Sequence, residues 1–320
     1  MVKNPAPEIQ ISSLRKMLLI RKVEEKLMNV FGAGEIPGFI HVCIGQEAAP
    51  VAVCSHLKPS DCLSSNHRGH GHALAKGIDL KSFMAELYGR RNGPCRGRSG
   101  SMHLADYSLG LLGANGIVGG GISIAVGAAF AAKYKKTDQV TVVFFGEGAS
   151  NEGTFHESLN LAMLMKLPIV FICENNRWAE FTPQEVHMPV EGVAVRASAY
   201  GMPGVAVPNQ FLAIYEASGE AIKRARDGEG PTLIEIRCHR WFGHFVGDAQ
   251  KYRPPEDIER ARQIDCIVDL KEYLIENGWL TEEDVKNMEA EIVTEVEDAV
   301  SFARQSPKPD PSELMEGVYS

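Results

Sequence analysis

The stretch that decides the fold runs from Gly146 to Asn176 and reads GEGASNEGTFHESLNLAMLMKLPIVFICENN. It follows an apolar, β-branched run at 139–145 and contains a second apolar run at 168–173, and each run is predicted to be a buried strand. Between them, apolar residues recur at helical spacing on one face of residues 152–166. The stretch therefore predicts a strand–helix–strand unit in a mostly parallel α/β sheet.

Polar residues stand where both predicted strands end. Glu147 follows the first strand and Asn175-Asn176 follows the second, and the carboxyl ends of parallel strands meet at one edge of a sheet. Glycines around Glu147 let the backbone approach a phosphate closely, and the helix N-terminus supplies free N–H donors. Carboxylate and amide oxygens suit Mg²⁺ better than zinc. We therefore expect Glu147 and Asn176 to hold a metal–diphosphate, although an ordinary strand–turn–helix is the alternative.

Composition sets the frame for this unit. The chain has 320 residues, of which 44% are hydrophobic, which is enough for one α/β domain over 1–320 with helical extensions at 1–35 and 256–320. The net charge of −8 argues against a nucleic-acid partner or an anionic membrane. Seven cysteines without a Cys-x-x-Cys pair indicate reduced thiols, so we expect a cytoplasmic protein.

One uncharged segment, Tyr107 to Ala132, is long enough to suggest a membrane span. It contains seven glycines, Asn115 and two serines, and these residues make its transfer into lipid unfavourable. We therefore predict a glycine- and alanine-rich loop followed by a helix that packs inside protein, and no membrane partner.

The pairing of Gly146-Glu147-Gly148 with Asn175-Asn176 resembles the thiamin diphosphate motif, which opens with Gly-Asp-Gly and closes with Asn-Asn. Further stretches extend the resemblance over nearly the whole chain: 38–41 (GFIH), 45–48 (GQEA), 67–71 (HRGHG), 97–103 (GRSGSMH), 115–119 (NGIVG) and 243–244 (GH). Together they resemble the α subunit of the thiamin diphosphate-dependent 2-oxoacid dehydrogenase family, which includes pyruvate, branched-chain 2-oxoacid and acetoin dehydrogenases. The resemblance implies a thiamin-diphosphate-binding fold.

The resemblance also assigns roles to single residues. Its metal ligands would be Glu147, Asn176 and the carbonyl of Trp178, with Mg²⁺ as the ion. Its cofactor-binding residues would be His67, Arg68, Gly116, Val118, Gly148, Ala149, Asn176 and His244, and its catalytic candidates His41, His70 and His244. Two positions depart from the usual pattern, because Glu147 replaces an Asp and His67 stands where many pyruvate-specific relatives carry Tyr.

Other interpretations of these residues remain open at this point. Arg68 could belong to a surface ion pair, and His244 could be a hydrogen-bonded core histidine. His67, His70 and His72 could suggest a metal site, but their spacing lacks a carboxylate or cysteine partner, which makes zinc a poor fit.

Thiamin enzymes need a glutamate that activates the cofactor, which full-length relatives carry on a second α/β domain. Only one diphosphate-binding unit is visible in this sequence. The resemblance therefore implies a β subunit that completes the active site in a tetramer of two α and two β chains. The resemblance favours the acetoin-cleaving branch, with decarboxylation of pyruvate or a branched-chain 2-oxoacid as the alternative, and implies acyl transfer to a lipoyl-bearing transacylase. A non-catalytic scaffold partner is the alternative from another functional class. A nucleotide-binding domain is not supported, because the sequence contains none of the glycine-rich motifs of such domains.

Overall fold

The protein is described by a computed structural model covering residues 4–316, so the outermost ends of both predicted extensions lie outside it. Its centre is a six-stranded sheet in the order β2-β1-β3-β4-β8-β7, and all neighbouring strands are parallel. The strands are β1 (Cys62–Ser64), β2 (Leu111–Gly113), β3 (Thr141–Gly146), β4 (Ile169–Asn175), β7 (Gly204–Pro208) and β8 (Thr232–Arg237). A separate antiparallel pair joins β5 (Trp178–Ala179) to β6 (Thr182–Pro183). The predicted parallel α/β fold is confirmed.

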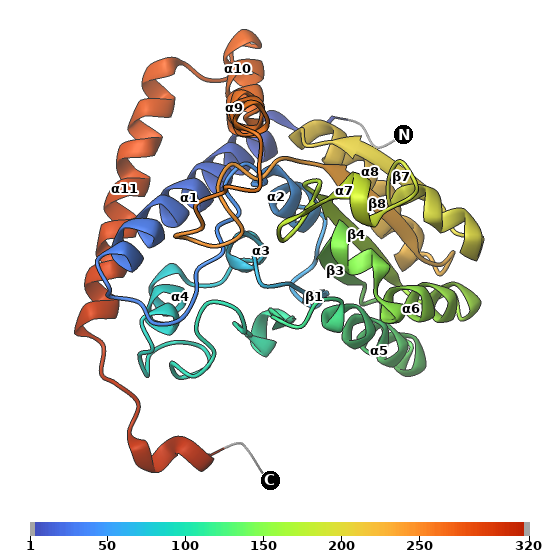
Figure 1. Cartoon of the computed structure of the whole chain (residues 1–320), viewed down its shortest axis with the longest axis horizontal. Coiled ribbons are helices and arrows are strands. Elements are labelled where there is room, and N and C mark those ends of the chain that lie inside the picture. Colours follow the sequence, from blue (N-terminus) through green and yellow to red (C-terminus); the bar gives the residue numbers. More distant parts are fainter. Residues whose placement is uncertain (1–3, 317–320) are drawn as a thin grey trace.

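The central strands are buried on both faces. Alternate side chains of β3 enter two different apolar clusters: Val142 and Phe144 lie in one, and Val143 and Phe145 in the other. The helices α5 (Gly120–Lys135) and α6 (Gly153–Leu164) cover one face, while α2 (Ala48–Cys54) and α8 (Phe211–Arg226) belong to the other (Figure 1). Burial on both faces explains why these strands read as continuous apolar runs.

The N-terminal and C-terminal helices pack together beside the sheet. The long helices α1 (Pro7–Gly32) and α11 (Glu282–Gln305) lie side by side in Figure 1. Apolar residues of α1 such as Leu14 and Met17 are fully buried in the same cluster as one face of β3, so this helix forms part of the core. The remaining helices are α3 (His70–Lys76), α4 (Leu80–Leu87), α7 (Gln184–His187), α9 (Pro255–Gln263) and α10 (Cys266–Glu276). The described part of the chain also contains four 3-10 helices: η1 (Tyr107–Leu109), η2 (Glu147–Asn151), η3 (Ala194–Tyr200) and η4 (Pro311–Met315).

The sequence patterns located some elements and missed others. The strands predicted at 139–145 and 168–173 correspond to β3 and β4. The uncharged segment leads into α5 as predicted, but it also contains η1 and β2, and α5 leaves Ile124 and Phe130 exposed. The strands β1 and β2 were not predicted because each has only three residues and depends on its neighbours in the sheet for pairing. Within residues 4–316, no helix has both the length and the apolar character needed to span a bilayer.

Candidate active site

A cavity of about 420 Å³ lies at the carboxyl edge of the sheet. Most of its lining comes from residues at or beyond the ends of β1, β2, β3, β4 and β8, and His41 and Gln46 join them from the segment before α2. The strand order reverses at β1, which lies between β2 and β3. From β1 the chain first adds β2 on one side of this strand and then β3 on its other side. Open α/β sheets bind ligands at such a reversal of strand order. The cavity is therefore where a ligand is expected.

Glu147 provides a buried carboxylate in the cavity wall. Its side chain is 1% exposed, and Oε2 accepts a long hydrogen bond of 3.3 Å from the backbone N–H of Asn176. The other oxygen, Oε1, is buried and has no hydrogen-bond partner. Burial raises the pKa of Glu147 to about 7. A buried carboxylate oxygen without a partner is unfavourable unless a ligand or metal satisfies it.

The two asparagines that end β4 point to different partners. Asn175 is directed away from the cavity, and its Nδ2 donates to Glu235 Oε1 at 2.7 Å. Asn176 lines the cavity beside Glu147, with Nδ2 donating to Gln46 Oε1 at 3.1 Å and Oδ1 accepting from the Trp178 N–H at 3.2 Å. A carbonyl oxygen has two lone pairs, so Asn176 Oδ1 retains one for a further ligand.

The turn after β3 is tightly packed at Gly148. A Cβ atom added there would lie 2.7 Å from the Cβ of Ala179 in β5, so only glycine fits at this point. The turn is the 3-10 helix η2, which was not predicted as a helix and lies between the predicted strand at 139–145 and the predicted helix at 152–166. Gly148 and Ala149, near the start of this turn, line the cavity, where backbone N–H groups at a helix N-terminus can bind an anion.

Two buried arginines bring positive charge to the cavity. Arg68 is 4% exposed, and its side chain donates only to backbone carbonyls, that of Val42 and, from Nη2 at 3.2 Å, that of His244, which excludes a surface ion pair. Arg240, 1% exposed, follows β8 and donates to Tyr252 Oη at 2.8 Å and to the Glu180 carbonyl at 3.1 Å. Its Nε has no partner, and burial, with the charge of Arg68, lowers its pKa to about 10. Neither guanidinium meets a carboxylate, so an anionic ligand would stabilise both.

Three histidines form one wall of the cavity. The ring centroids of His41, His67 and His244 lie 5.0 to 5.2 Å from one another. Burial first, and then the charge of Arg68, lowers the pKa of His41 to about 3, of His244 to about 4, and of His67 well below its usual value. The rings are therefore neutral at physiological pH, and Nδ1 of His41 is buried without a partner.

His244 begins a loop that is fixed by hydrogen bonds. Its backbone N–H donates to Asp248 Oδ2 at 2.6 Å, and Tyr252 Oη donates to the same oxygen at 2.6 Å. Tyr252 in turn accepts from Arg240, so the arginine and this loop form one network.

His70 lies outside the cavity, contrary to its sequence assignment as a catalytic candidate. It is fully buried, with Nδ1 2.9 Å from Glu24 Oε2 and Nε2 2.8 Å from Ser101 Oγ. Both ring nitrogens are occupied by protein groups. Its position is that of a hydrogen-bonded core residue.

The remaining predicted residues line the open end of the cavity. Gly116 and Val118 both border it, and Val118 is 55% exposed. Trp178 lines the cavity from β5 and donates through Nε1 to Asp257 Oδ2 at 3.2 Å. Arg240 and Gln46 also line the cavity but were missed in the sequence. Arg240 could have been found from the sequence, because it lies just beyond the predicted strand at 231–238, which ends at the same edge of the sheet as the strands before Glu147 and Asn176.

The cavity as a whole fits a diphosphate with a divalent cation. It offers an unpartnered carboxylate oxygen and an amide oxygen for the cation, and backbone N–H groups with two arginines for the anion.

Comparison with known proteins gives a consistent result. The family model described as "Dehydrogenase E1 component" matches residues 15–312. The chain is 48% identical to the α subunit of acetoin:2,6-dichlorophenolindophenol oxidoreductase from Bacillus subtilis, an alignment that covers 95% of this chain and 92% of that protein. It is 44% identical to the protein of the same name from Cupriavidus necator, over 98% and 94% of the two chains. It is also 39% identical to a pyruvate dehydrogenase E1 component subunit alpha from Rhizobium meliloti, over 96% and 89%.

Proposed function

Because this chain belongs to the dehydrogenase E1 component family of thiamin diphosphate-dependent oxidoreductases, we propose that it is the α subunit of an acetoin dehydrogenase that binds Mg²⁺–thiamin diphosphate in this cavity. The observation that carries the proposal is the buried, unpartnered Oε1 of Glu147 beside Asn176. In this proposal Glu147, Asn176 and the carbonyl of Trp178 hold Mg²⁺. The longer glutamate in place of aspartate keeps the ligand chemistry, and its free oxygen lies in the cavity wall.

The diphosphate would bind beside the metal. Gly148 and Ala149 offer N–H groups to it, and Arg68, Arg240 and His244 surround the same cavity. Gly116 and Val118 would meet the aminopyrimidine ring, with His67 nearby, and His41 would face the substrate. Bound thiamin diphosphate supplies a nucleophilic carbon and an electron sink. The neutral ring of His41 has an open Nδ1 and can donate or accept a proton there.

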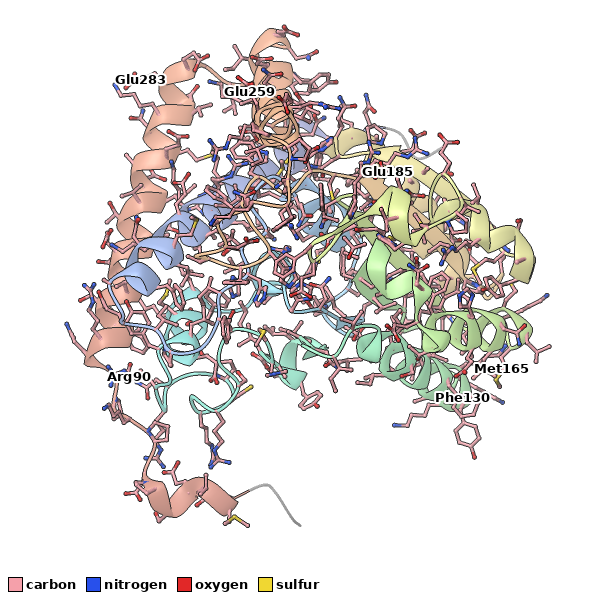
Figure 2. All side chains as sticks on the ribbon, in the orientation of Figure 1. Arg90, Phe130, Met165, Glu185, Glu259 and Glu283 are labelled. Atoms are coloured by element: carbon pink, nitrogen blue, oxygen red, sulfur yellow. The ribbon has the colours of Figure 1, made fainter. Side chains whose placement is uncertain are left out.

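A β subunit would cover the exposed apolar surface of this chain. Before Lys133 the helix α5 carries no charged residue on any side, yet Ile124 and Phe130 are 51% and 44% exposed, and Tyr134 in its last turn is 80% exposed. Phe130 lies at the outer edge of the molecule in Figure 2, and Leu161 and Leu164 of α6 are also exposed. A helix that is apolar all round is normally buried, which favours a partner here. We infer that the partner is the β subunit, in a tetramer of two α and two β chains that passes its acyl group to a lipoyl-bearing transacylase.

The substrate is inferred from similarity. The two acetoin relatives are 48% and 44% identical, against 39% for the pyruvate relative from Rhizobium meliloti. Turnover of the assembled complex on acetoin, pyruvate and branched-chain 2-oxoacids would test the assignment. We expect the highest kcat/KM with acetoin, and a preference for pyruvate would contradict it.

The cofactor site is tested by calorimetry of thiamin diphosphate with Mg²⁺ on the complex. Glu147→Ala should weaken Mg²⁺-dependent binding by about 100-fold or more, because it removes a direct ligand. Glu147→Asp is the matched control and should bind within about tenfold of the native complex. Equal binding by Glu147→Ala and native protein would favour the non-catalytic scaffold alternative.

A further inference from the structure

Gln46 is a buried cavity residue to which no role has been assigned above. It is 1% exposed and lies in the turn between Gly45 and Glu47, just before α2. Its Oε1 accepts two hydrogen bonds, from Asn176 Nδ2 at 3.1 Å and from Cys238 Sγ at 3.3 Å. The side chain therefore contacts a proposed metal ligand directly.

The two hydrogen bonds fix the orientation of the side-chain amides of Gln46 and Asn176. Burial raises the pKa of the Cys238 thiol well above its usual value, so the thiol keeps its proton and donates it to Gln46 Oε1. With that oxygen fixed, Asn176 can meet it only through its NH₂ group. The Oδ1 of Asn176 is then the end left for a cation.

The backbone that carries Gln46 is held on both sides. Gly45 has a φ of +93°, and an added Cβ would lie 2.6 Å from the carbonyl oxygen of His239, so this turn tolerates only glycine. The carbonyl of Gly45 accepts from Asn209 Nδ2 at 2.7 Å, and its N–H donates to Glu47 Oε2 at 3.0 Å. The turn therefore has little freedom to move.

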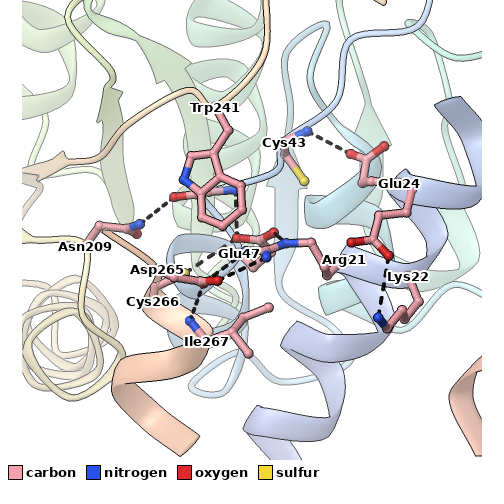
Figure 3. Close-up of polar contacts among 12 residues, drawn as sticks. Arg21, Lys22, Glu24, Cys43, Glu47, Asn209, Trp241, Asp265, Cys266 and Ile267 are labelled. Atoms are coloured by element: carbon pink, nitrogen blue, oxygen red, sulfur yellow. Dashed lines mark hydrogen bonds and ion pairs between the residues drawn. The ribbon is translucent and has the colours of Figure 1, made fainter. Parts of the chain in front are cut away.

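Glu47 belongs to a cluster, named here the Arg21 cluster, that comprises the buried Arg21 and Glu47 and the half-buried Asp265 and Trp241 (Figure 3). Arg21 of α1 donates through Nε to Glu47 Oε1 and through both terminal nitrogens to Asp265, each at 3.1 Å. Its guanidinium carbon lies 4.4 Å from the ring centroid of Trp241. Although burial opposes the charge, the two carboxylates raise the pKa of Arg21 above its usual value.

We propose that Gln46 is a positioning residue that orients Asn176 for the cation, and that the Arg21 cluster holds Gln46 in place from the helical side of the molecule. The inference rests on the proposed function, because it requires Asn176 to be a metal ligand. It links a buried ion pair on α1 to the metal site through Glu47, the 45–47 turn and Gln46. Such supporting groups typically change metal affinity by about 10- to 100-fold when removed.

The test measures Mn²⁺ affinity by electron paramagnetic resonance in the assembled complex at saturating thiamin diphosphate. Gln46→Met keeps the size of the side chain but removes both polar ends, and should weaken Mn²⁺ binding about 10- to 100-fold. Gln46→Glu keeps acceptor oxygens for Asn176 and Cys238 and should bind Mn²⁺ at least as well as native protein. A purely structural role would instead lower the melting temperature of Gln46→Met and leave its Mn²⁺ affinity unchanged, which would overturn the inference. Weak binding by Gln46→Glu would overturn it as well.

The second variant tests the cluster and keeps the inference falsifiable if Gln46→Met does not assemble. Arg21→Met should weaken Mn²⁺ binding by about threefold or more, whereas Lys22→Met, its neighbour on α1 outside the cluster, should not. Equal affinities for these two variants would contradict the proposed role of the cluster. If native protein binds no Mn²⁺–thiamin diphosphate, the proposed function itself fails; if native protein binds and Gln46→Met binds equally, only this inference fails.

Discussion

The sequence offered two buried histidines as catalytic candidates, His41 in the cavity wall and His70 in the core. They differ in whether their ring nitrogens have hydrogen-bond partners. His70 has a protein partner on each ring nitrogen, Glu24 on one side and Ser101 on the other. His41 has a buried Nδ1 without a partner. The same contrast separates Glu47, bonded to Arg21 and Gly45, from Glu147, whose Oε1 is unpartnered.

The difference indicates which buried polar groups the fold uses for itself and which it leaves for a ligand. Native proteins pair nearly all buried polar atoms, so an unpartnered atom needs an explanation. Among residues 4–316, eleven buried side-chain atoms have no partner, and three of them, on His41, Glu147 and Arg240, belong to residues that line one cavity. The core network instead contributes to stability. Substitutions in the two regions should therefore affect different properties.

The largest expected effect is on stability at His70. Although complete burial opposes ionisation, His70 holds the pKa of Glu24 below its usual value, so His70→Leu leaves a buried charge unpaired. We expect the free energy of unfolding to fall by about 3–5 kcal/mol, measured by urea denaturation at fixed protein concentration. His41→Leu replaces a ring whose buried Nδ1 has no partner, and should change stability by less than about 1 kcal/mol while lowering kcat. Similar losses of stability in both variants would remove the distinction between the two regions.

A smaller effect is expected on ligand binding at Arg240. Arg240→Met removes a buried guanidinium that we expect to meet the diphosphate, and charge-assisted hydrogen bonds contribute about 1.5–3 kcal/mol. Calorimetry should therefore give thiamin diphosphate affinity lower by roughly 10- to 150-fold. The control is Arg237→Met, because Arg237 ends the same strand but is exposed outside the cavity. If both variants bind as native protein does, Arg240 has no role in the site.

The smallest effect is a pH dependence. Burial lowers the pKa of His41 to about 3, whereas in the unfolded chain this group titrates near 6.5. Between these values the unfolded state binds more protons, so His41 makes the ligand-free protein less stable as pH falls below about 6.5. The pKa of Glu147 is raised to about 7, so this carboxyl group has the opposite effect on stability as pH falls. The contribution of His41 is therefore taken as the difference between native protein and a His41 variant, in which Glu147 contributes equally.

The measurement is the slope of unfolding free energy against pH between 6 and 5, without cofactor. Native protein should show a slope greater than that of His41→Gln by up to about 1.4 kcal/mol per pH unit, the value for one proton. Identical slopes would mean that His41 is protonated equally in the folded and unfolded chain.

Most of the central fold was readable from the sequence because its signals are local. The apolar runs of β3 and β4 are continuous, and Glu147 and Asn176 follow them directly, so one stretch located the edge of the sheet and two of its polar residues. The structure places Arg68, His67, His244, Gly116 and Val118 around the same cavity.

The remaining features depend on contacts between distant segments. Gln46 and Asn176 are 130 residues apart, so nothing near either residue reveals their hydrogen bond. His70 lies beside His67 and Arg68 in the sequence, but the start of α3 turns its side chain toward Glu24 on α1. The direction of a side chain at the start of a helix depends on packing, which sequence spacing does not specify.

The most direct test of the central claim is a crystal structure of the assembled complex with Mg²⁺ and thiamin diphosphate. We predict the metal about 2.1 Å from Glu147 Oε1, the oxygen that is unpartnered here, with Asn176 Oδ1 as a second ligand. A diphosphate bound outside this cavity, or a metal that contacts neither Glu147 nor Asn176, would contradict the claim.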